Sequence, residues 1–376
     1  MLSEEKMKKK RKKRLNLQEI YESTKKYNYV RISGGKVTEI PDYFEWIGSS
    51  FTISDAPIEK LPKKLIVNGD FILHKTKITE LPEYLFVCGD FKVSKTPITK
   101  MPDSLFVGGN LDVSGTKITE LPKRLFVKKD INISGTQVKE LPKNLRVYGE
   151  LNIKNTPITS LPDNFTVETL DLKDTLVTSL PSNLTVDNLY LGKTAITTLP
   201  KDLTVVDSLY INNTQISELP DVLCLEGSLN IHNTPIKKLP STLHVKGYLD
   251  ISNTEIDEFP KDFYVGTELQ MSRSKITEFP SDFDCVNNLG SIYANNSSLR
   301  KLPDNFSVED ILDINGTMIE KLPKNLNIGY ALVINSTRIT ELPEDLKVGG
   351  WVVAKKGQIK NVPKGIKMRF VERKTL

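Results

Sequence analysis

Prolines recur along this chain at a nearly constant spacing, and this repeat restricts the fold more than any other feature of the sequence. Seventeen of the 21 prolines follow Leu, Ile, Val, Met or Phe, and most successive members of this set lie 20 residues apart. Intervals of 19 residues follow Pro162 and Pro181, and one interval of 23 residues separates Pro280 from Pro303. A period of this length predicts short structural units that stack into one solenoid.

The apolar residues within each unit indicate how it folds. Residues 101–120 read MPDSLFVGGNLDVSGTKITE, and a typical unit places seven of its twenty residues at apolar positions. Alternation of apolar and polar residues, as in 111–113, predicts a short strand. The same strand in the next turn makes the sheet parallel. We therefore expect a β-rich solenoid, with a parallel sheet on the concave side of a right-handed superhelix and a core that only stacked turns can bury.

Threonine follows the strand in twelve turns, from Thr76 in the third turn to Thr337 near the end. The chain leaves the sheet at this point, and its backbone groups lose their partners in the sheet. A small hydroxyl side chain can replace those partners by bonding to nearby backbone. The column predicts a ladder of hydrogen bonds along the stack, in which Ser274 and Ser297 substitute for threonine.

The pattern LxIxxTxIxxLP is similar to the LxVxxNxLxxLP core of the short bacterial leucine-rich-repeat family, found in effectors of the YopM and IpaH kind. The resemblance covers about residues 29–370 and implies the leucine-rich-repeat fold. Two departures are evident. Threonine replaces the family's asparagine, and the convex side reads LPxxLxV with a glycine in place of a second Leu-Pro pair. The resemblance therefore implies the fold without implying membership of the effector group.

Charge divides the chain into an acidic body and two basic ends. Residues 1–28 carry a net charge of +6, residues 355–376 carry +7, and the remainder carries −8. We expect a disordered basic tail over 1–14, a cap helix over 15–28, the solenoid over 29–354 and a basic C-terminal cap over 355–376. The cap helix is predicted from the spacing of Leu15, Leu17, Ile20 and Tyr21.

The basic tail admits several interpretations. It could be a nuclear address, a nucleic-acid contact, a contact to an anionic surface or a solvated tail. No apolar segment follows it, so we do not interpret it as a secretory signal. Three cysteines without close spacing favour a reducing compartment. We expect a cytoplasmic protein and leave delivery into a host cell or nuclear targeting open. The tail residues are Lys8, Lys9, Lys10, Arg11, Lys12, Lys13 and Arg14.

The strand positions that face the concave side are the candidate binding residues. Acidic side chains dominate the N-terminal half, which favours a basic protein partner, and tyrosines with amides dominate the middle, a mixture suited to protein recognition. The sequence predicts a non-enzymatic module that binds a macromolecular partner; a solvated polar sheet is the other interpretation. The candidates are Asp112, Asn132, Asn152, Asp171, Tyr190, Tyr210, Asn230, Tyr248 and Asp250.

A second candidate surface lies on the convex side. Phe86, Phe106 and Phe126 recur in register there and follow Ile66. An exposed apolar strip would fit an interface, as in a structural component of a larger assembly such as a viral or phage particle. A locally rotated backbone could bury the rings instead. The oligomeric state stays open.

Catalytic chemistry finds little support in the sequence. The three histidines, His74, His232 and His244, are too widely separated along the stack to form one site. Residues 88–90 match the Cys-x-Asp motif of ligase effectors, but they lie within a repeat. No run of about 18 apolar residues could span a bilayer. We therefore expect no enzymatic activity, no cofactor, no metal site and no transmembrane segment.

Overall fold

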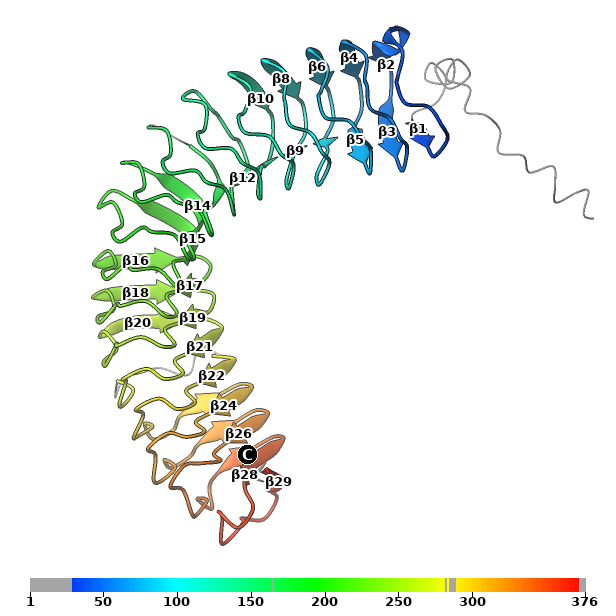
Figure 1. Ribbon diagram of the computed structural model, residues 1–376. Helices are drawn as coiled ribbons and strands as arrows, with labels where there is room; N and C mark the ends of the chain where they lie inside the picture. Colours follow the sequence, from blue (N-terminus) through cyan, green and yellow to red (C-terminus); the bar gives the residue numbers. More distant parts are fainter. Residues whose placement is uncertain (1–28, 164–165, 281–282, 284–288, 372–376) are drawn as a thin grey trace, which may run out of the picture. The chain divides into compact units, whose positions relative to one another are not determined.

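The computed structural model describes residues 29–163, 166–280, 283 and 289–371. The expected tail over 1–14 and the expected cap helix over 15–28 lie outside these residues. The chain divides into a first unit, Met1–Val177, and a second unit, Thr178–Leu376. Each unit is a stack of short turns with parallel strands and almost no helix, as the repeat predicts (Figure 1). The parallel β-solenoid is therefore confirmed.

The first unit contains one strand of the main sheet in each turn. Every recorded pair is parallel, and equivalent positions of successive turns lie in register, as in Leu111 with Ile131. Among the described residues of this unit, the one helical element is a 3-10 turn, Asp42–Phe44. The main-sheet strands are β1 (Tyr29–Ser33), β3 (Ser50–Ser54), β5 (Phe71–His74), β7 (Phe91–Lys92), β9 (Leu111–Asp112), β11 (Ile131–Asn132), β12 (Glu150–Asn152) and β13 (Thr169–Asp171).

A second sheet, which the sequence analysis did not predict, forms on the other side of the first unit (Figure 1). Residues such as 104–107 alternate outward and inward, so their backbone adopts an extended conformation and pairs with the next turn. The strands of this sheet are β2 (Trp46–Ile47), β4 (Lys64–Val67), β6 (Tyr84–Val87), β8 (Ser104–Val107) and β10 (Arg124–Val127).

The second unit repeats this arrangement with two short outer sheets. One outer sheet holds β16 (Val222–Leu225), β18 (Thr242–Val245) and β20 (Asp262–Val265); the other holds β23 (Ser307–Val308), β25 (Asn327–Ile328) and β27 (Lys347–Val348). The main-sheet strands are β14 (Thr185–Tyr190), β15 (Thr204–Tyr210), β17 (Leu229–Asn230), β19 (Leu249–Asp250), β21 (Glu268–Gln270), β22 (Ser291–Tyr293), β24 (Ile311–Asp313), β26 (Ala331–Val333), β28 (Trp351–Lys355) and β29 (Lys367–Val371).

The core of each unit is a set of apolar columns between the two layers. Leu111, Val113 and Ile118 of one turn are at most 1% exposed. Phenylalanine rings replace leucine in the first turns, where Phe71 stacks on Phe91 with their ring centroids 5.3 Å apart. A single turn leaves these side chains open to solvent above and below. Stability therefore depends on contact between neighbouring turns.

The threonine column caps each turn, but it does not form the expected ladder between turns. Each paired hydroxyl donates to the carbonyl three residues earlier in its own turn, as Thr136 does to Ile133 at 2.7 Å. The residue before the threonine adopts a positive φ, for example 54° at Asn155. This sharp reversal brings the hydroxyl back onto its own strand. The bond is therefore local, whereas the prediction placed it along the stack.

The two predicted serine substitutes behave differently from the threonines. Ser274 and Ser297 are buried in the column, yet their hydroxyls have no hydrogen-bond partner among the described residues, and neither does Thr76. At the C-terminal end the side chain of Gln358 covers the column. Its amide donates to the carbonyl of Ile334 at 2.9 Å and to the hydroxyl of Thr337 at 3.1 Å.

Candidate binding surface

Except for Tyr248, the predicted concave residues of each unit occupy equivalent positions on the solvent face of its main-sheet strands. We call this set of positions the central row. In the first unit Asp112, Asn132 and Asn152 occupy equivalent places in adjacent strands. In the second unit Tyr190 and Tyr210 lie side by side, and Asn230 follows them in register. Most of these side chains are half-buried.

Two predicted binding residues have little exposed surface. Asp171 is 8% exposed and Asp250 is 7% exposed. Asp171 lies 3.7 Å from the ammonium of Lys173, and Asp250 accepts the backbone N–H of Ser252 at 2.9 Å. Both carboxylates therefore bond mainly to neighbouring residues of their own turn. Their positions in the sequence did not indicate this.

Backbone geometry explains why aspartate and asparagine are frequent in the central row. Asp112 accepts the backbone N–H of Ser114 at 2.9 Å, and Asn152 accepts that of Lys154 at 3.2 Å. Each side chain thus satisfies the N–H group two residues later, where the strand ends and the turn begins. The same bond recurs at Asn132, Asp171, Asn230, Asp250 and Asp313.

The acidic column two residues earlier forms the actual ladder between turns. Asp70 accepts the backbone N–H of Asp90 at 2.8 Å, and Asp90 accepts that of Asn110 at 2.9 Å. Asn110 and Asp130 continue the pattern to Glu150. Main-chain donors therefore compensate the row of like charges. The sequence argument, which called for a cation or a basic partner, did not foresee these donors.

Electrostatics differ along this acidic ladder. Burial alone would raise the pKa of Asp90, but the Asn110 N–H and the Lys92 ammonium, 2.8 Å away, hold that pKa below its ordinary value. Burial and the charges of Asp130 and Asp171 raise the pKa of Glu150. The neighbourhood of Glu150 is thus the least compensated acidic part of the first unit's main-sheet face.

Three tyrosines form an aromatic cluster on the main-sheet face of the second unit. The rings of Tyr190 and Tyr210 stack with centroids 4.6 Å apart and planes 10° apart. Tyr248 lies in the neighbouring row and tilts against Tyr210 at 6.2 Å. Burial is the main cause that raises the pKa of Tyr248 to about 12, although a hydrogen bond with Asn230 acts the other way. The sequence prediction of a clustered tyrosine surface therefore has a geometric basis.

The row also contains residues that the sequence analysis missed. Tyr293 lies in register between Gln270 and Asp313, on the strand that follows the 23-residue turn. Aligning that turn on its strand, rather than on its proline, would have found it. The extra residues of that turn fall largely outside the described residues.

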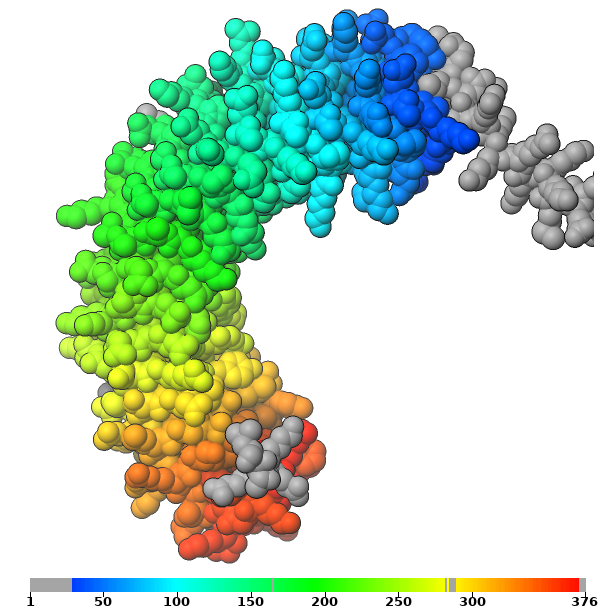
Figure 2. Space-filling view, in the orientation of Figure 1, coloured from blue at the N-terminus to red at the C-terminus, as the bar shows by residue number. Residues whose placement is uncertain are grey.

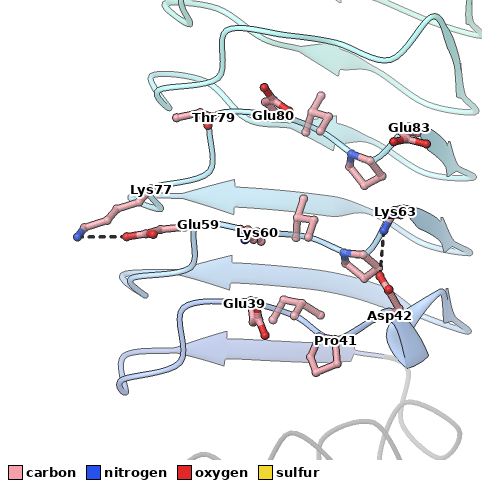
Figure 3. Close-up of a pocket in the computed structure, with 15 residues that line it drawn as sticks. Glu39, Pro41, Asp42, Glu59, Lys60, Lys63, Lys77, Thr79, Glu80 and Glu83 are labelled. Atoms are coloured by element: carbon pink, nitrogen blue, oxygen red, sulfur yellow. Dashed lines mark hydrogen bonds and ion pairs between the residues drawn. The ribbon is translucent and has the colours of Figure 1, made fainter.

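A shallow hollow of about 350 Å³ adjoins the tyrosine cluster. Its lining includes Asn230, His232, Gln270, Ser272 and Arg273. A larger hollow of about 840 Å³ lies on the flank of the first unit, where successive Leu-Pro steps form an apolar strip between charged side chains (Figure 3). Glu59 pairs there with Lys77 at 3.6 Å.

The convex strip forms an outward column on the second sheet of the first unit. Phe106 stacks between Phe86 and Phe126, with ring centroids 4.3 and 5.1 Å away. Phe126 is 44% exposed, and the other two rings are half-buried. Register adds Ile66 and Trp46 to the column, and Trp46 is 42% exposed. The backbone therefore does not rotate these rings into the core.

Groups with catalytic or metal-binding potential are scattered. Within the described ranges no three His, Cys, Asp or Glu side chains gather as a metal site. His244 pairs with Asp262 at 2.6 Å on an exposed outer sheet. Asp90 of the Cys-x-Asp match is held in the acidic ladder. The part of the chain that the structure describes contains no helix long and apolar enough to cross a membrane.

Comparison with solved structures identifies the fold. No family model and no curated protein matches the sequence. YopM from Yersinia enterocolitica is 19% identical, with a TM-score of 0.56 over 94% of this chain and 89% of that chain. YopM from Yersinia pestis is 17% identical, with a TM-score of 0.54 over 95% and 91%.

A leucine-rich-repeat protein from Leptospira interrogans is 17% identical, with a TM-score of 0.50 over 86% of this chain and 94% of that chain. At these identities the likeness concerns the fold. Because the likeness covers 86–95% of this chain, the chain has the leucine-rich-repeat fold of these bacterial proteins.

Proposed function

We propose that this protein is a non-enzymatic interaction module that binds a protein partner on the solvent face of its main sheet. The tyrosine cluster is the observation that carries the proposal. The rings of Tyr190 and Tyr210 are stacked on each other, which restricts their rotamers, so binding costs them little further side-chain entropy. Tyrosines combine a broad apolar ring with a polar hydroxyl and are enriched at protein interfaces.

The surroundings of the cluster favour a protein over a small molecule. The adjoining hollow is shallow and lined by amide, hydroxyl and charged groups, which suits a partner side chain better than an enclosed ligand. The first unit adds acidic groups around Glu150, where a basic segment of the partner would be favoured. The Yersinia pestis neighbour is described as a leucine-rich effector protein, which supports an interaction role for this chain as well.

The compartment we propose for this interaction is a reducing one. Cys88 and Cys224 are exposed free thiols. Free exposed thiols are more compatible with the cytoplasm than with an oxidising compartment.

Alanine substitution of Tyr210 tests the proposed site. The wild-type protein and its variants would be used to capture partners from the native host, with quantitative mass spectrometry of the proteins retained. Loss of the central ring removes a stacked, half-buried anchor, and we expect recovery of the partner to fall at least about tenfold. Tyr330→Ala is the matched control, because Tyr330 is 53% exposed in the same unit and lies outside the cluster.

Asp112→Lys tests the basic character of the partner. If a basic segment docks on the first unit, charge reversal should weaken recovery and reduce its dependence on salt. Equal recovery by wild type, Tyr210→Ala and Asp112→Lys would contradict binding on this face.

The convex strip supports a second candidate, a structural component of a larger assembly. Five outward apolar side chains in register are an unusual solvent surface for a monomer. Sedimentation velocity of wild type and Phe106→Asp tests it. An assembly packed through the strip should dissociate in the variant and persist in Val222→Asp, which places the same charge on an exposed outer-sheet position of the second unit. A wild-type monomer at all concentrations would count against this candidate.

A further inference from the structure

The last described strand, β29, has no described strand on its second backbone edge, and its core-side residues are partly exposed. It pairs with β28 along one edge, and no register with another described strand is found on its second edge. Met368 and Phe370 stand opposite Val352 and Ala354, which are fully buried in the core. Phe370 itself is 50% exposed. The last described turn thus presents partly exposed apolar side chains beside a strand edge to which a further strand could add.

The other face of β29 is basic. Lys367 and Arg369 stand opposite Trp351 and Val353 on the solvent face of the main sheet, and both are exposed. Residues 355–371 contain six lysines and arginines and no acidic residue. None of the six forms an ion pair within the described part of the chain. The end of the stack therefore presents uncompensated positive charge beside an open strand edge.

From this combination we propose that β29 is a docking edge for an extended acidic segment of a partner protein, which adds as the next strand of the main sheet. The backbone edge supplies hydrogen bonds in either strand direction. Because strand residues alternate between faces, apolar residues of the segment would cover Met368 and Phe370 while acidic residues meet Lys367 and Arg369. This site is separate from the tyrosine cluster and does not depend on the function proposed above.

The positive charge of β29 favours an acidic segment of a partner protein over a second copy of this chain. Pairing two β29 strands would place Lys367 and Arg369 of both copies near each other. Docking on β1 of another copy would bring them towards Arg31, which lies on the solvent face of that strand. Like charges facing each other across strands disfavour pairing. Lys367 and Arg369 thus disfavour self-association and leave an acidic strand as the favoured occupant.

Apolar exposure selects a peptide over nucleic acid. A phosphate backbone would engage the lysines, but it would leave Phe370, Met368 and the strand edge uncovered. A peptide strand satisfies the charge, the apolar side chains and the backbone groups together. The alternating pattern of acidic and apolar residues is thus the recognition signal.

Fluorescence anisotropy with a labelled heptapeptide of alternating glutamate and valine tests the proposal on the full-length protein. We expect saturable binding that weakens at least about tenfold in Lys367→Glu/Arg369→Glu. Lys324→Glu/Lys347→Glu makes the same change in net charge at exposed positions of the second unit and should bind like wild type. A peptide of the same composition with the glutamates in one block, and one with proline at its centre, should bind at least about tenfold more weakly.

Hydrogen exchange locates the peptide without any variant. Amides of residues 367–371 should gain protection when the alternating peptide is added to wild-type protein. Equal affinity for the block and alternating peptides, unchanged exchange at 367–371, or unchanged affinity of Lys367→Glu/Arg369→Glu would overturn the proposal. Binding of polyuridylate or phosphatidylserine vesicles in place of the alternating peptide would overturn it too and would identify a phosphate-binding surface.

Discussion

At the scale of single residues, the threonine position after the strand shows how much a buried hydroxyl contributes to the stability of this fold. Thr136 is fully buried, and its hydroxyl donates to Ile133 in the same turn. Thr76 is 6% exposed at the equivalent position, yet its hydroxyl has no partner within the described ranges. The two residues have the same size and place in the turn, and they differ in the hydrogen bond.

Substitution by valine separates the two cases. Thr136→Val removes a satisfied buried bond and should lower the free energy of unfolding by about 0.5–1.5 kcal/mol. Thr76→Val removes an unsatisfied polar group and should leave stability unchanged or raise it. Urea denaturation measures both. Equal destabilisation by the two substitutions would show that the hydroxyl acts through something other than this bond.

At the scale of the turn, Gly149 is required because a larger residue would not fit there, and its backbone conformation does not demand glycine. A β-carbon at Gly149 would lie 2.2 Å from the Oδ1 atom of Asp130, the atom that accepts the N–H of Glu150 in the acidic ladder. The next nearest atom is 3.4 Å away. The absence of a side chain at Gly149 therefore leaves room for the Asp130 carboxylate to reach the Glu150 N–H, so the two positions depend on each other.

A double-mutant cycle tests that coupling. Gly149→Ala displaces the Asp130 carboxylate from the Glu150 N–H and should cost about 1–3 kcal/mol. In the Asp130→Ala background the obstructing atom is absent, so the same substitution should cost much less. Denaturant unfolding of the four proteins gives the interaction energy. Additive effects would mean that Asp130 does not cause the glycine requirement.

At the scale of the whole molecule, the repeat period predicts which deletions the stack tolerates. Removing residues 105–124 deletes one repeat period and joins Ser104 to Leu125. Leu125 occupies the inward position in its turn that Leu105 occupies in the preceding turn. We expect the shortened protein to keep its β-sheet circular dichroism and cooperative unfolding, because every remaining turn retains its neighbours.

Removing residues 105–114 provides the control. That deletion removes β9 and all of β8 except Ser104 but keeps the rest of the turn, so the remaining half-turn cannot stack on its neighbours and cooperative unfolding should be lost. If both shortened proteins unfold alike, stacking of equivalent positions is not what holds the first unit together.

The sequence by itself determined the solenoid, the parallel sheet and the rows of residues on its faces. Apolar positions repeating every 20 residues can be buried in one way only, by equivalent turns lying on each other. The stacked tyrosines and the outward phenylalanines follow from the same register. Tyr293 was missed because the long turn obscured that register.

The tertiary structure alone decided what the polar side chains bond to. The Asp70 carboxylate meets a backbone N–H that lies 20 residues later in the chain, and the hydroxyl of Thr136 returns to its own turn. The first contact depends on how adjacent turns are placed and the second on the backbone reversal within one turn, and a residue pattern contains neither. The open edge of β29 likewise appears only once the last turn is in place, because exposure is a property of what lies beside a strand.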